Sequence, residues 1–296
     1  MPEIRVSSLF LVASDPNPAP SPRHGCVDGR ERSEGQRVRL TVLGSGAACP
    51  PGGQNSSGYL VETGRDDAGG RRLLLDCGHG VASALLAARP QGDVDDIWVT
   101  HMHADHFIDI LALRFRVSRL LPGVPAAERR ITLHLPPGGR ASLEAILKAV
   151  SFPADFLDRA FRVREYAPDD VQEAGGVRVC VAPGAHYIDS FAIRVEADGA
   201  ALCYSGDTAP SPHVVALARS ADLFICEAAL DEPEDGDVRG HCTPEEAARM
   251  AAQAGAGRLL LSHFWYGTDT EAFACRARAA AAIPVDVAHD GYQRTL

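Results

Sequence analysis

The sequence predicts an α/β domain in which helices cover β-sheet, and three observations support this fold class. Short β-rich runs alternate with helical segments from about residue 38 to the end of the chain. Loops that contain Gly and Pro separate these runs. The 296 residues are 46% hydrophobic and 23% charged, as in ordinary globular proteins with one large domain or two small ones. Collagen-like, coiled-coil and disordered classes are therefore excluded.

Residues 1–37 differ from the rest of the chain. They contain five prolines and a charged, Gly-rich stretch from Asp28 to Gln36, and they show no hydrophobic periodicity. Such a segment buries too little apolar surface to fold, so we predict a disordered N-terminal extension. The folded domain is then expected over residues 38–296.

The folded domain is expected to begin with β-rich runs bounded by turn residues, at Arg39–Leu43, Gly58–Glu62 and Arg72–Asp76. A helix at Val81–Ala88 and a strand at Ile97–Thr100 follow. Later strands are expected at Ile131–Leu135, Val177–Val181, Phe191–Val195, Ala201–Tyr204, Leu223–Cys226, Leu259–Ser262 and Val285–Ala288. Later helices are expected at His106–Leu120, Ala141–Val150, Ser211–Ser220, Pro244–Ala254 and Thr270–Ala281.

Charge and cysteine content limit the partners and the compartment. The formal net charge is −10, which argues against non-specific coating of nucleic acid or of an anionic membrane. No apolar run approaches the ~20 residues that cross a bilayer, so no membrane association is expected. The eight cysteines form no C-x-x-C pair, and we expect free, buried thiols in a reducing compartment. A cytoplasmic protein is the resulting prediction.

Four metal-competent side chains fall within six residues at the end of an apolar strand, in Thr100-His101-Met102-His103-Ala104-Asp105-His106. In an extended chain His101 and His103 project to the same face, so both can reach one ion. Asp105 and His106 lie where the chain turns toward a helix, and they point toward a second ion beside the first. The alternative is an exposed, His-rich loop, which would not need imidazoles and a carboxylate packed together after a buried strand.

This stretch resembles the H-x-H-x-D-H signature of the metallo-β-lactamase fold hydrolases, and the resemblance covers about residues 38–296. Asp76 in Leu-Leu-Leu-Asp-Cys-Gly is similar to the first motif of that family. The later motifs follow in the family's order, with His186 after Pro183-Gly184-Ala185, Asp207 in Ser205-Gly206-Asp207-Thr208, and His263 after Leu259–Ser262. The resemblance implies a four-layer αββα sandwich with the site at the sheet edge, which composition and periodicity do not distinguish from another layered α/β fold.

The resemblance also implies a dinuclear metal centre, in which one ion is bound by His101, His103 and His186, the other by Asp105, His106 and His263, and both by Asp207. Taken alone, Asp207 would more often be a turn residue. Imidazole and carboxylate ligands suit two Zn²⁺ ions best, and Mn²⁺ or iron stays open on ligand type. With a bridging hydroxide such a centre remains cationic, which favours a small anionic substrate. Asp76 is expected to support the ligand loop by hydrogen bonding.

Two further residues resemble the RNase Z-like branch of the family. In Gly240-His241-Cys242-Thr243-Pro244, His241 is similar to the histidine that serves the leaving group, and Glu227 to its acidic partner. A carboxylate beside an imidazole stabilises the protonated form, which can then donate a proton. The alternative is that His241 is a loop residue while Thr243 caps the helix that begins at Pro244.

These residues lead to a functional hypothesis, hydrolysis of small or cyclic phosphodiesters. The metal-bridging hydroxide would attack phosphorus, His241 would act as general acid, and Asp105 would steer the nucleophile. Only 20 residues separate His186 and Asp207, which leaves no room for the tRNA-gripping arm of the tRNA-processing members. Nucleic acid is therefore a disfavoured partner, although tRNA 3′ processing stays an alternative.

Other reaction classes also stay open. The same site would suit hydrolysis of a lactone, a thioester or a sulfate ester. Non-hydrolytic alternatives are an iron oxidoreductase and a metal-bearing RNA-binding module, which the second ligand set and the acidic net charge disfavour. The oligomeric state, including a homodimer, is open as well.

Overall fold

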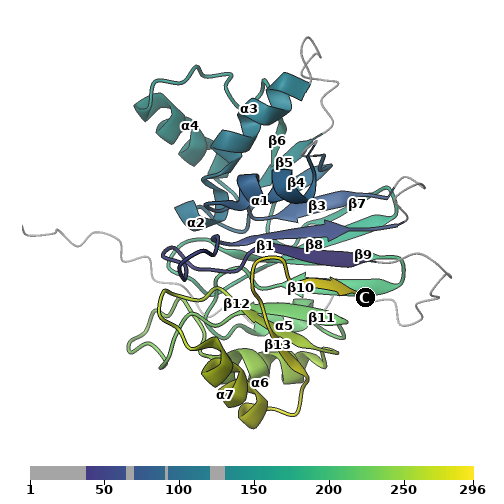
Figure 1. Ribbon diagram of the computed structural model, residues 1–296, viewed down its shortest axis with the longest axis vertical. Coiled ribbons are helices and arrows are strands. Elements are labelled where there is room, and N and C mark those ends of the chain that lie inside the picture. Colours follow the sequence, from purple (N-terminus) through teal and green to yellow (C-terminus); the bar gives the residue numbers. More distant parts are fainter. Residues whose placement is uncertain (1–37, 65–69, 91–92, 121–130) are drawn as a thin grey trace, which may run out of the picture. The chain divides into compact units, whose positions relative to one another are not determined.

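The structure is a computed structural model that describes residues 38–64, 70–90, 93–120 and 131–296 (Figure 1). All of these residues lie in the unit Glu31–Leu296. The N-terminal extension expected for residues 1–37 lies outside the described residues, so this expectation and the domain boundary at residue 38 stay predictions.

The first sheet is built from the N-terminal half of the described chain and the last strand. Its order is β14-β1-β2-β3-β4-β5-β6. β1, β2 and β3 pair antiparallel, whereas β3 to β6 pair parallel. The strands are β1 (Arg39–Gly44), β2 (Gly58–Glu62), β3 (Arg72–Leu75), β4 (Asp96–Trp98), β5 (Thr132–Leu135), β6 (Arg162–Glu165) and β14 (Gln293–Thr295).

The second sheet has the order β13-β12-β11-β10-β9-β8-β7. Its first four strands pair parallel and the other three join by antiparallel hairpins. The strands are β7 (Val171–Ala174), β8 (Val177–Pro183), β9 (Phe191–Ala197), β10 (Ala200–Tyr204), β11 (Leu223–Glu227), β12 (Leu259–Ser262) and β13 (Val285–Val287).

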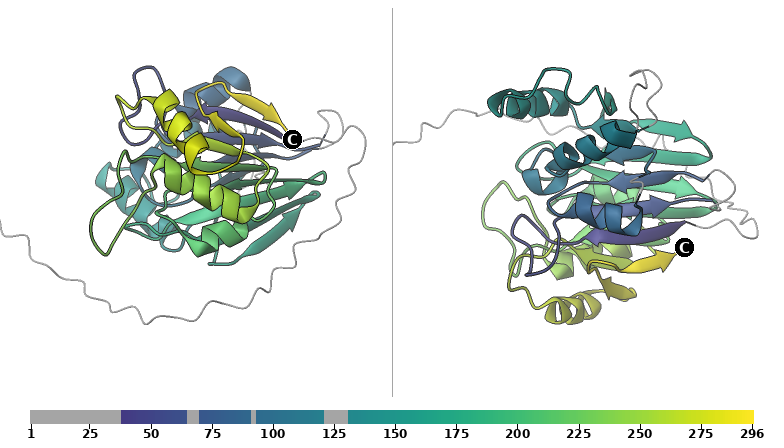
Figure 2. Two further views of the ribbon diagram at one scale, coloured as in Figure 1. Left: turned by 90° about the horizontal axis from the view of Figure 1, so that it is seen from below. Right: turned by 45° about the horizontal axis from the view of Figure 1, so that its top comes forward.

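Three apolar cores hold four layers together. Side chains such as Leu40, Tyr59, Ile193 and Leu202 fill the space between the two sheets. A second core joins the outer face of the first sheet to α1 (Val81–Ala88), α3 (Ile110–Leu120) and α4 (Gly139–Ala149). A third joins the outer face of the second sheet to α5 (Pro212–Leu217), α6 (Pro244–Ala254) and α7 (Thr270–Ala280). The helices lie on either side of the paired sheets (Figures 1 and 2), which confirms the predicted αββα sandwich.

The helix expected at His106–Leu120 is divided into α2 (Ala104–Phe107) and α3. The backbone N–H of Cys77 donates to the carbonyl of His106 at 2.7 Å, so this carbonyl is engaged outside the helix and the helix breaks there. The break separates the metal-competent turn from the apolar helix that follows it.

Three strands, β6, β7 and β14, are absent from the sequence-based prediction. β6 and β7 are edge strands with mostly exposed, charged or mixed side chains, and they lack the buried alternation that marks a strand. β14 has only three residues. These strands complete the sheets without contributing to the candidate site.

The cysteines only partly match expectation. Among the described residues Cys77, Cys180, Cys203, Cys226 and Cys242 are free and buried, but Cys49 and Cys275 are free and exposed. The expectation that all the thiols are buried is therefore wrong, because Cys49 lies in an open loop and Cys275 on the outer side of α7.

None of the helices in the described ranges combines the length and the apolar character needed to cross a membrane.

Candidate metal centre

The metal-competent residues lie in segments that follow the carboxyl ends of strands, and both sheets contribute such strands. His101 and His103 follow β4, Asp105 and His106 begin α2, His186 follows β8, Asp207 follows β10, and His263 follows β12. β8 and β10 are both antiparallel to β9, and β10, β11 and β12 are parallel, so these three ligand-bearing strands of the second sheet end at one edge. Loops at such an edge are common positions for binding sites in α/β proteins.

One group consists of His101, His103, His186 and Asp207, whose ligand atoms lie within 4.8 Å of one another. His103 Nδ1 is 3.1 Å from the Nε2 atoms of both His101 and His186. Asp207 Oδ2 is 3.6 Å from His101 Nε2. Three imidazole nitrogens and one carboxylate oxygen therefore converge on one point, which is a suitable donor set for a divalent ion.

The other group consists of Asp105, His106, His263 and the same Asp207. Asp207 Oδ1 is 3.3 Å from His106 Nε2, and its Oδ2 is 3.2 Å from His263 Nε2. Asp105 Oδ2 is 3.4 Å from His106 Nε2. Asp207 thus belongs to both groups, as expected for the bridging ligand that the family resemblance implies.

Each of four rings engages a partner through Nδ1, which leaves Nε2 directed inward. His106 Nδ1 lies 2.7 Å from Asp76 Oδ2, and His186 Nδ1 lies 2.8 Å from the carbonyl of Gly240. His101 and His263 engage hydroxyl groups, of Thr100 at 3.0 Å and of Ser57 at 3.0 Å. These contacts fix ring orientation and favour the tautomer whose Nε2 lone pair can bind a metal.

Two buried polar atoms indicate that the donor set is built for ions. His106 Nε2 and Asp207 Oδ1 are buried and make no hydrogen bond in the described part of the chain. Unsatisfied buried polar atoms are costly, and a metal ion is a partner that satisfies an imidazole lone pair and a carboxylate oxygen together. The residues therefore fit divalent ions, and imidazole with carboxylate suits zinc.

Burial is the largest cause of the pKa shifts of His186 and His101, which belong to the first donor group. It lowers the pKa of His186 to about 4 and holds the pKa of His101 well below 6.5. These rings are neutral at pH 7 and have lone pairs to donate. Burial also lowers the pKa of His106, but the carboxylates of Asp207, Asp76 and Asp105 outweigh it, so the pKa of His106 is raised well above 6.5.

The carboxylate of Asp76 accepts several hydrogen bonds that hold the ligand loop in place. Its Oδ1 accepts from the backbone N–H of Thr100 at 2.7 Å, and its Oδ2 accepts from Thr100 Oγ1 at 2.9 Å and from Tyr204 OH at 2.8 Å. Asp76 has a φ of 58°, a left-handed conformation that Asp and Asn tolerate better than most residues. Its position supports the predicted role as a residue that orients the ligands.

Asp76→Asn is expected to lower metal affinity about 10- to 100-fold, because removal of the charge weakens the bond that orients His106. Asparagine keeps the left-handed backbone, so the change tests the carboxylate rather than the turn. Titration against a competing chelator measures the effect. Asp269→Asn is the matched control, since Asp269 caps α7 far along the chain and asparagine also caps helices. Equal affinities in the two variants would contradict the role of Asp76.

Gly78 allows the ligand turn to approach the first sheet. A Cβ atom at Gly78 would lie 1.9 Å from the carbonyl oxygen of Asp105. Gly78→Ala is therefore expected to lower the free energy of unfolding by about 1–3 kcal/mol and to weaken metal binding, because the turn must move. Gly52→Ala is the control, since a Cβ atom there has open space. Thermal unfolding and metal content of the two variants check this, and similar values for both would contradict it.

The loop after β12 places His263 under backbone constraint. His263 has a φ of 64°, and its backbone N–H donates to the carbonyl of Ser45 at 2.7 Å. Phe264, fully buried, anchors the next position, and its carbonyl accepts from the N–H of Ala47 at 3.0 Å. A strained backbone at a candidate ligand persists because the surrounding contacts determine it. The loop at Gly44–Gly46 therefore borders the centre.

A charged pair lies beside the two groups. His241 Nδ1 is 2.9 Å from Oε1 of Glu227, which is 1% exposed. The same carboxylate accepts from the backbone N–H groups of Thr208, Ala229 and Cys242 at 2.8–3.2 Å. Burial lowers the pKa of His241, but its hydrogen bond to Glu227 and the negative charges of Glu227, Asp207 and Glu234 raise it to about 9. The His241 ring centroid lies 4.9 Å from that of His186 and 5.8 Å from that of His263.

A family model described as a β-lactamase superfamily domain matches residues 71–264. This chain belongs to the β-lactamase superfamily. A relative of unassigned function from Mycobacterium leprae is 32% identical over 255 residues, which cover 86% of this chain and 87% of the relative. A ribonuclease Z from Myxococcus xanthus is 28% identical over 309 residues, which cover 86% of this chain and 96% of that enzyme.

The solved structure of a metallo-β-lactamase fold protein, YhfI from Bacillus subtilis, superposes on the chain with a TM-score of 0.74. It covers 88% of this chain and all of YhfI, at 24% identity. In the sequence comparison YhfI is named a probable metallo-hydrolase and is 28% identical over 226 residues, 76% of this chain and 86% of YhfI. The predicted membership of the metallo-β-lactamase fold hydrolases is thus confirmed. As a superfamily member the chain is a metal-dependent hydrolase that uses divalent metal.

The structure brings all seven predicted ligands of this superfamily member together, and it places Glu227 and His241 against them. Their roles stay proposals. Sequence reasoning missed Thr100, Tyr204, Ser57 and Glu234, which hold the predicted residues in place. Thr100 directly precedes His101, and Glu234 lies seven positions before His241, whereas Tyr204 and Ser57 act across the fold.

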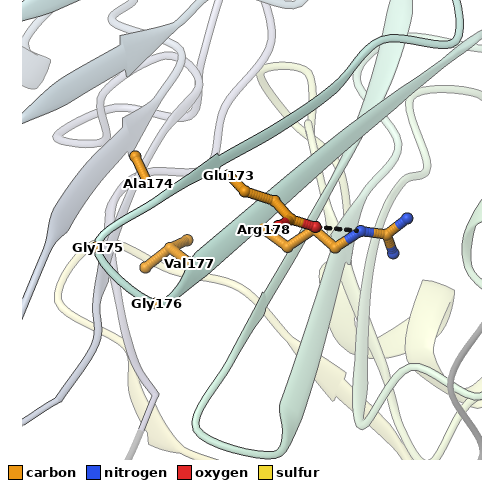
Figure 3. A pocket seen from close by; sticks show the side chains of 6 residues that line it. All are labelled: Glu173, Ala174, Gly175, Gly176, Val177 and Arg178. Atoms are coloured by element: carbon orange, nitrogen blue, oxygen red, sulfur yellow. Dashed lines mark ion pairs between the residues drawn. The ribbon is translucent and has the colours of Figure 1, made fainter.

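A separate cavity lies far from this centre along the second sheet. Figure 3 shows it at the turn between β7 and β8, lined by residues 173–178, with an ion pair of 3.3 Å between Glu173 and Arg178. Its volume is about 400 Å³. The turn directly precedes β8, whereas His186 follows the carboxyl end of β8. The cavity is therefore not part of the candidate centre.

Proposed function

We propose that this hydrolase is a dinuclear zinc phosphodiesterase that acts on small or cyclic phosphodiesters. The observation that carries the proposal is the pair of partly buried His241 and buried Glu227 beside two convergent donor groups. A phosphodiester with an ordinary alcohol as leaving group needs a proton on the departing oxygen, and the carboxylate of Glu227 favours the protonated form of His241, which can donate one. A thioester would not need this donor, because a thiolate leaves with a pKa of only about 8.5.

The metal ligands proposed are His101, His103, Asp105, His106, His186, Asp207 and His263. Divalent ions bound there would lower the pKa of water to about 7 and neutralise charge on the phosphate oxygens. Asp105 is mostly buried beside His106 and His263, and its carboxylate would orient the attacking water. His241 would hold the leaving-group proton on its Nε2 side while Glu227 keeps Nδ1 engaged.

Two observations favour a small substrate over a tRNA. The 20 residues between His186 and Asp207 form β9, β10 and their turn at Asp198 and Gly199, and so no arm is inserted there. The net charge is −10, which opposes binding of a long polyanion. Ribonuclease activity, as the name of the Myxococcus relative states for that protein, is therefore the second candidate.

The experiment is a substrate panel on one preparation with its metals quantified. The full chain is stripped with a chelator and reconstituted with Zn²⁺, Mn²⁺ or Fe²⁺. Bis-aryl phosphate, a cyclic nucleotide, a lactone, a thioester, a sulfate ester and a precursor tRNA are then assayed. We expect two Zn²⁺ per chain and turnover of the phosphodiesters that is lost on chelation and restored by zinc. Turnover of a lactone, thioester or sulfate ester without turnover of any phosphodiester would overturn the proposal, as would one iron per chain.

A further inference from the structure

Exposed apolar side chains gather on the loops that carry the candidate centre. Among the described residues nine large apolar side chains are exposed, and five of them lie within three residues of His186, His241 or His263. These five are Tyr187, Ile188, Val238, Trp265 and Tyr266. Apolar surface around a polar centre is typical of a site that binds the organic part of a ligand.

Tyr187 lies beside the proposed proton donor. Its ring centroid lies 5.7 Å from that of His241 and 4.9 Å from that of His186. The residue is 50% exposed, so a large part of the ring surface is free. A group that leaves from phosphorus toward His241 would pass beside this ring.

The orientation of the Tyr187 ring is fixed. Tyr187 OH donates to Oε1 of Glu234, and Oε2 of Glu234 accepts from the backbone N–H groups of Gly240 at 2.6 Å and His241 at 3.2 Å. The ring covers Gly240 so closely that a Cβ atom there would lie 2.4 Å from it. A ring held in this way loses little entropy when a second planar group stacks on it.

The charge of the surrounding loop limits what can stack there. Residues 231–237 carry five carboxylates, and the neighbouring Arg239 is paired with Glu246 at 2.8 Å. A further phosphate group would be repelled at this side of the centre, whereas an uncharged planar group would not.

Building on the proposed phosphodiesterase activity, we propose that Tyr187 is a specificity-determining residue that stacks on a nucleobase, so that the substrate is a mononucleotide-type phosphodiester rather than an alkyl one. The phosphate lies at the metal centre, and the base lies against the free surface of Tyr187 on the His241 side. Base–aromatic stacking is tolerant of base identity, so purines and pyrimidines are both accepted.

Binding is tested with two probes that differ only by the base, adenosine monophosphate and ribose 5-phosphate. Calorimetry on the zinc-reconstituted full chain gives the ratio of their dissociation constants. We expect the wild-type chain to bind the nucleotide at least tenfold more tightly, and Tyr187→Leu to reduce this ratio about tenfold. Tyr187→Phe keeps the ring but loses the bond to Glu234, so it should lower the ratio much less than Tyr187→Leu does. Phe115→Leu, which removes an exposed aromatic ring on α3, is the matched control and should keep the ratio.

Turnover gives the second readout, as the ratio of kcat/KM for adenosine 2′,3′-cyclic phosphate to that for glycerol 1,2-cyclic phosphate. The same variants should change this ratio in the same way. An equal ratio in wild type and Tyr187→Leu, or no preference for the base in the wild type, overturns the inference even if phosphodiesters are hydrolysed. A Tyr187-dependent preference in binding without hydrolysis of any phosphodiester supports base recognition and overturns the proposed function instead.

Discussion

Asp207→Asn is expected to reduce turnover by about 10³-fold or more and to lower the metal content well below that of the wild-type chain. Asp207 is the one residue common to both donor groups, with its two oxygens 3.2–3.3 Å from His263 and His106. Asparagine has the same shape but no negative charge, so two nearby dications would lose the anion that screens their repulsion. Among the described residues, no other ligand is shared by these two groups.

The measurement combines metal analysis of the purified variant with steady-state kinetics at saturating added zinc. Asp269→Asn serves as the control for the chemical change, because Asp269 lies at the start of α7. Circular dichroism establishes that the variant folds. A variant that keeps its full metal content and activity would contradict the assignment of Asp207 as a bridging ligand.

His241→Ala is expected to reduce hydrolysis of substrates with alkoxide leaving groups by about 10²–10⁴-fold, the usual contribution of a general acid. Hydrolysis of a bis-aryl phosphate should fall less than about tenfold, because a nitrophenolate leaves without a proton. The structural reason is the contact of 2.9 Å between His241 Nδ1 and the buried carboxylate of Glu227, which holds the ring as a proton donor.

The control variant is His213→Ala, which removes an exposed histidine at the start of α5. The decisive quantity is the slope of log kcat/KM against leaving-group pKa, which should become steeper in His241→Ala alone. Equal losses on alkyl and aryl substrates would show that His241 positions the substrate or the ligands instead of donating a proton.

The local sequence predicted the ligand loop for two reasons. Four metal-competent side chains lie between Thr100 and His106, and they directly follow an apolar, strand-like run. The order of motifs around Asp207 and His263 predicted the remaining ligands, although neither residue is distinctive on its own. The supporting contacts were not predictable in this way. Tyr204 reaches Asp76 over 128 positions and Ser57 reaches His263 over 206, so the pairs exist only once the two sheets face each other.

The missed and altered elements have equally specific causes. Edge strands β6 and β7 gain stability from pairing rather than from buried alternation, so hydrophobic periodicity does not mark them. The division of the helix at Phe107 depends on a hydrogen bond between Cys77 and His106, residues on opposite sides of a 28-residue connection. Hydrophobic periodicity indicates which side chains are buried. It does not indicate that a distant backbone N–H group will bind a carbonyl group of the helix.

The donor groups draw on both sheets, with four ligands from the half of the chain before residue 107 and three from the half after residue 185. Ions bound there would act as a cross-link between these two parts of the chain. By thermodynamic linkage, a ligand at about 1,000 times its dissociation constant adds about 4 kcal/mol to the free energy of unfolding. Metal supply would then affect the lifetime of the folded protein as well as its rate of turnover.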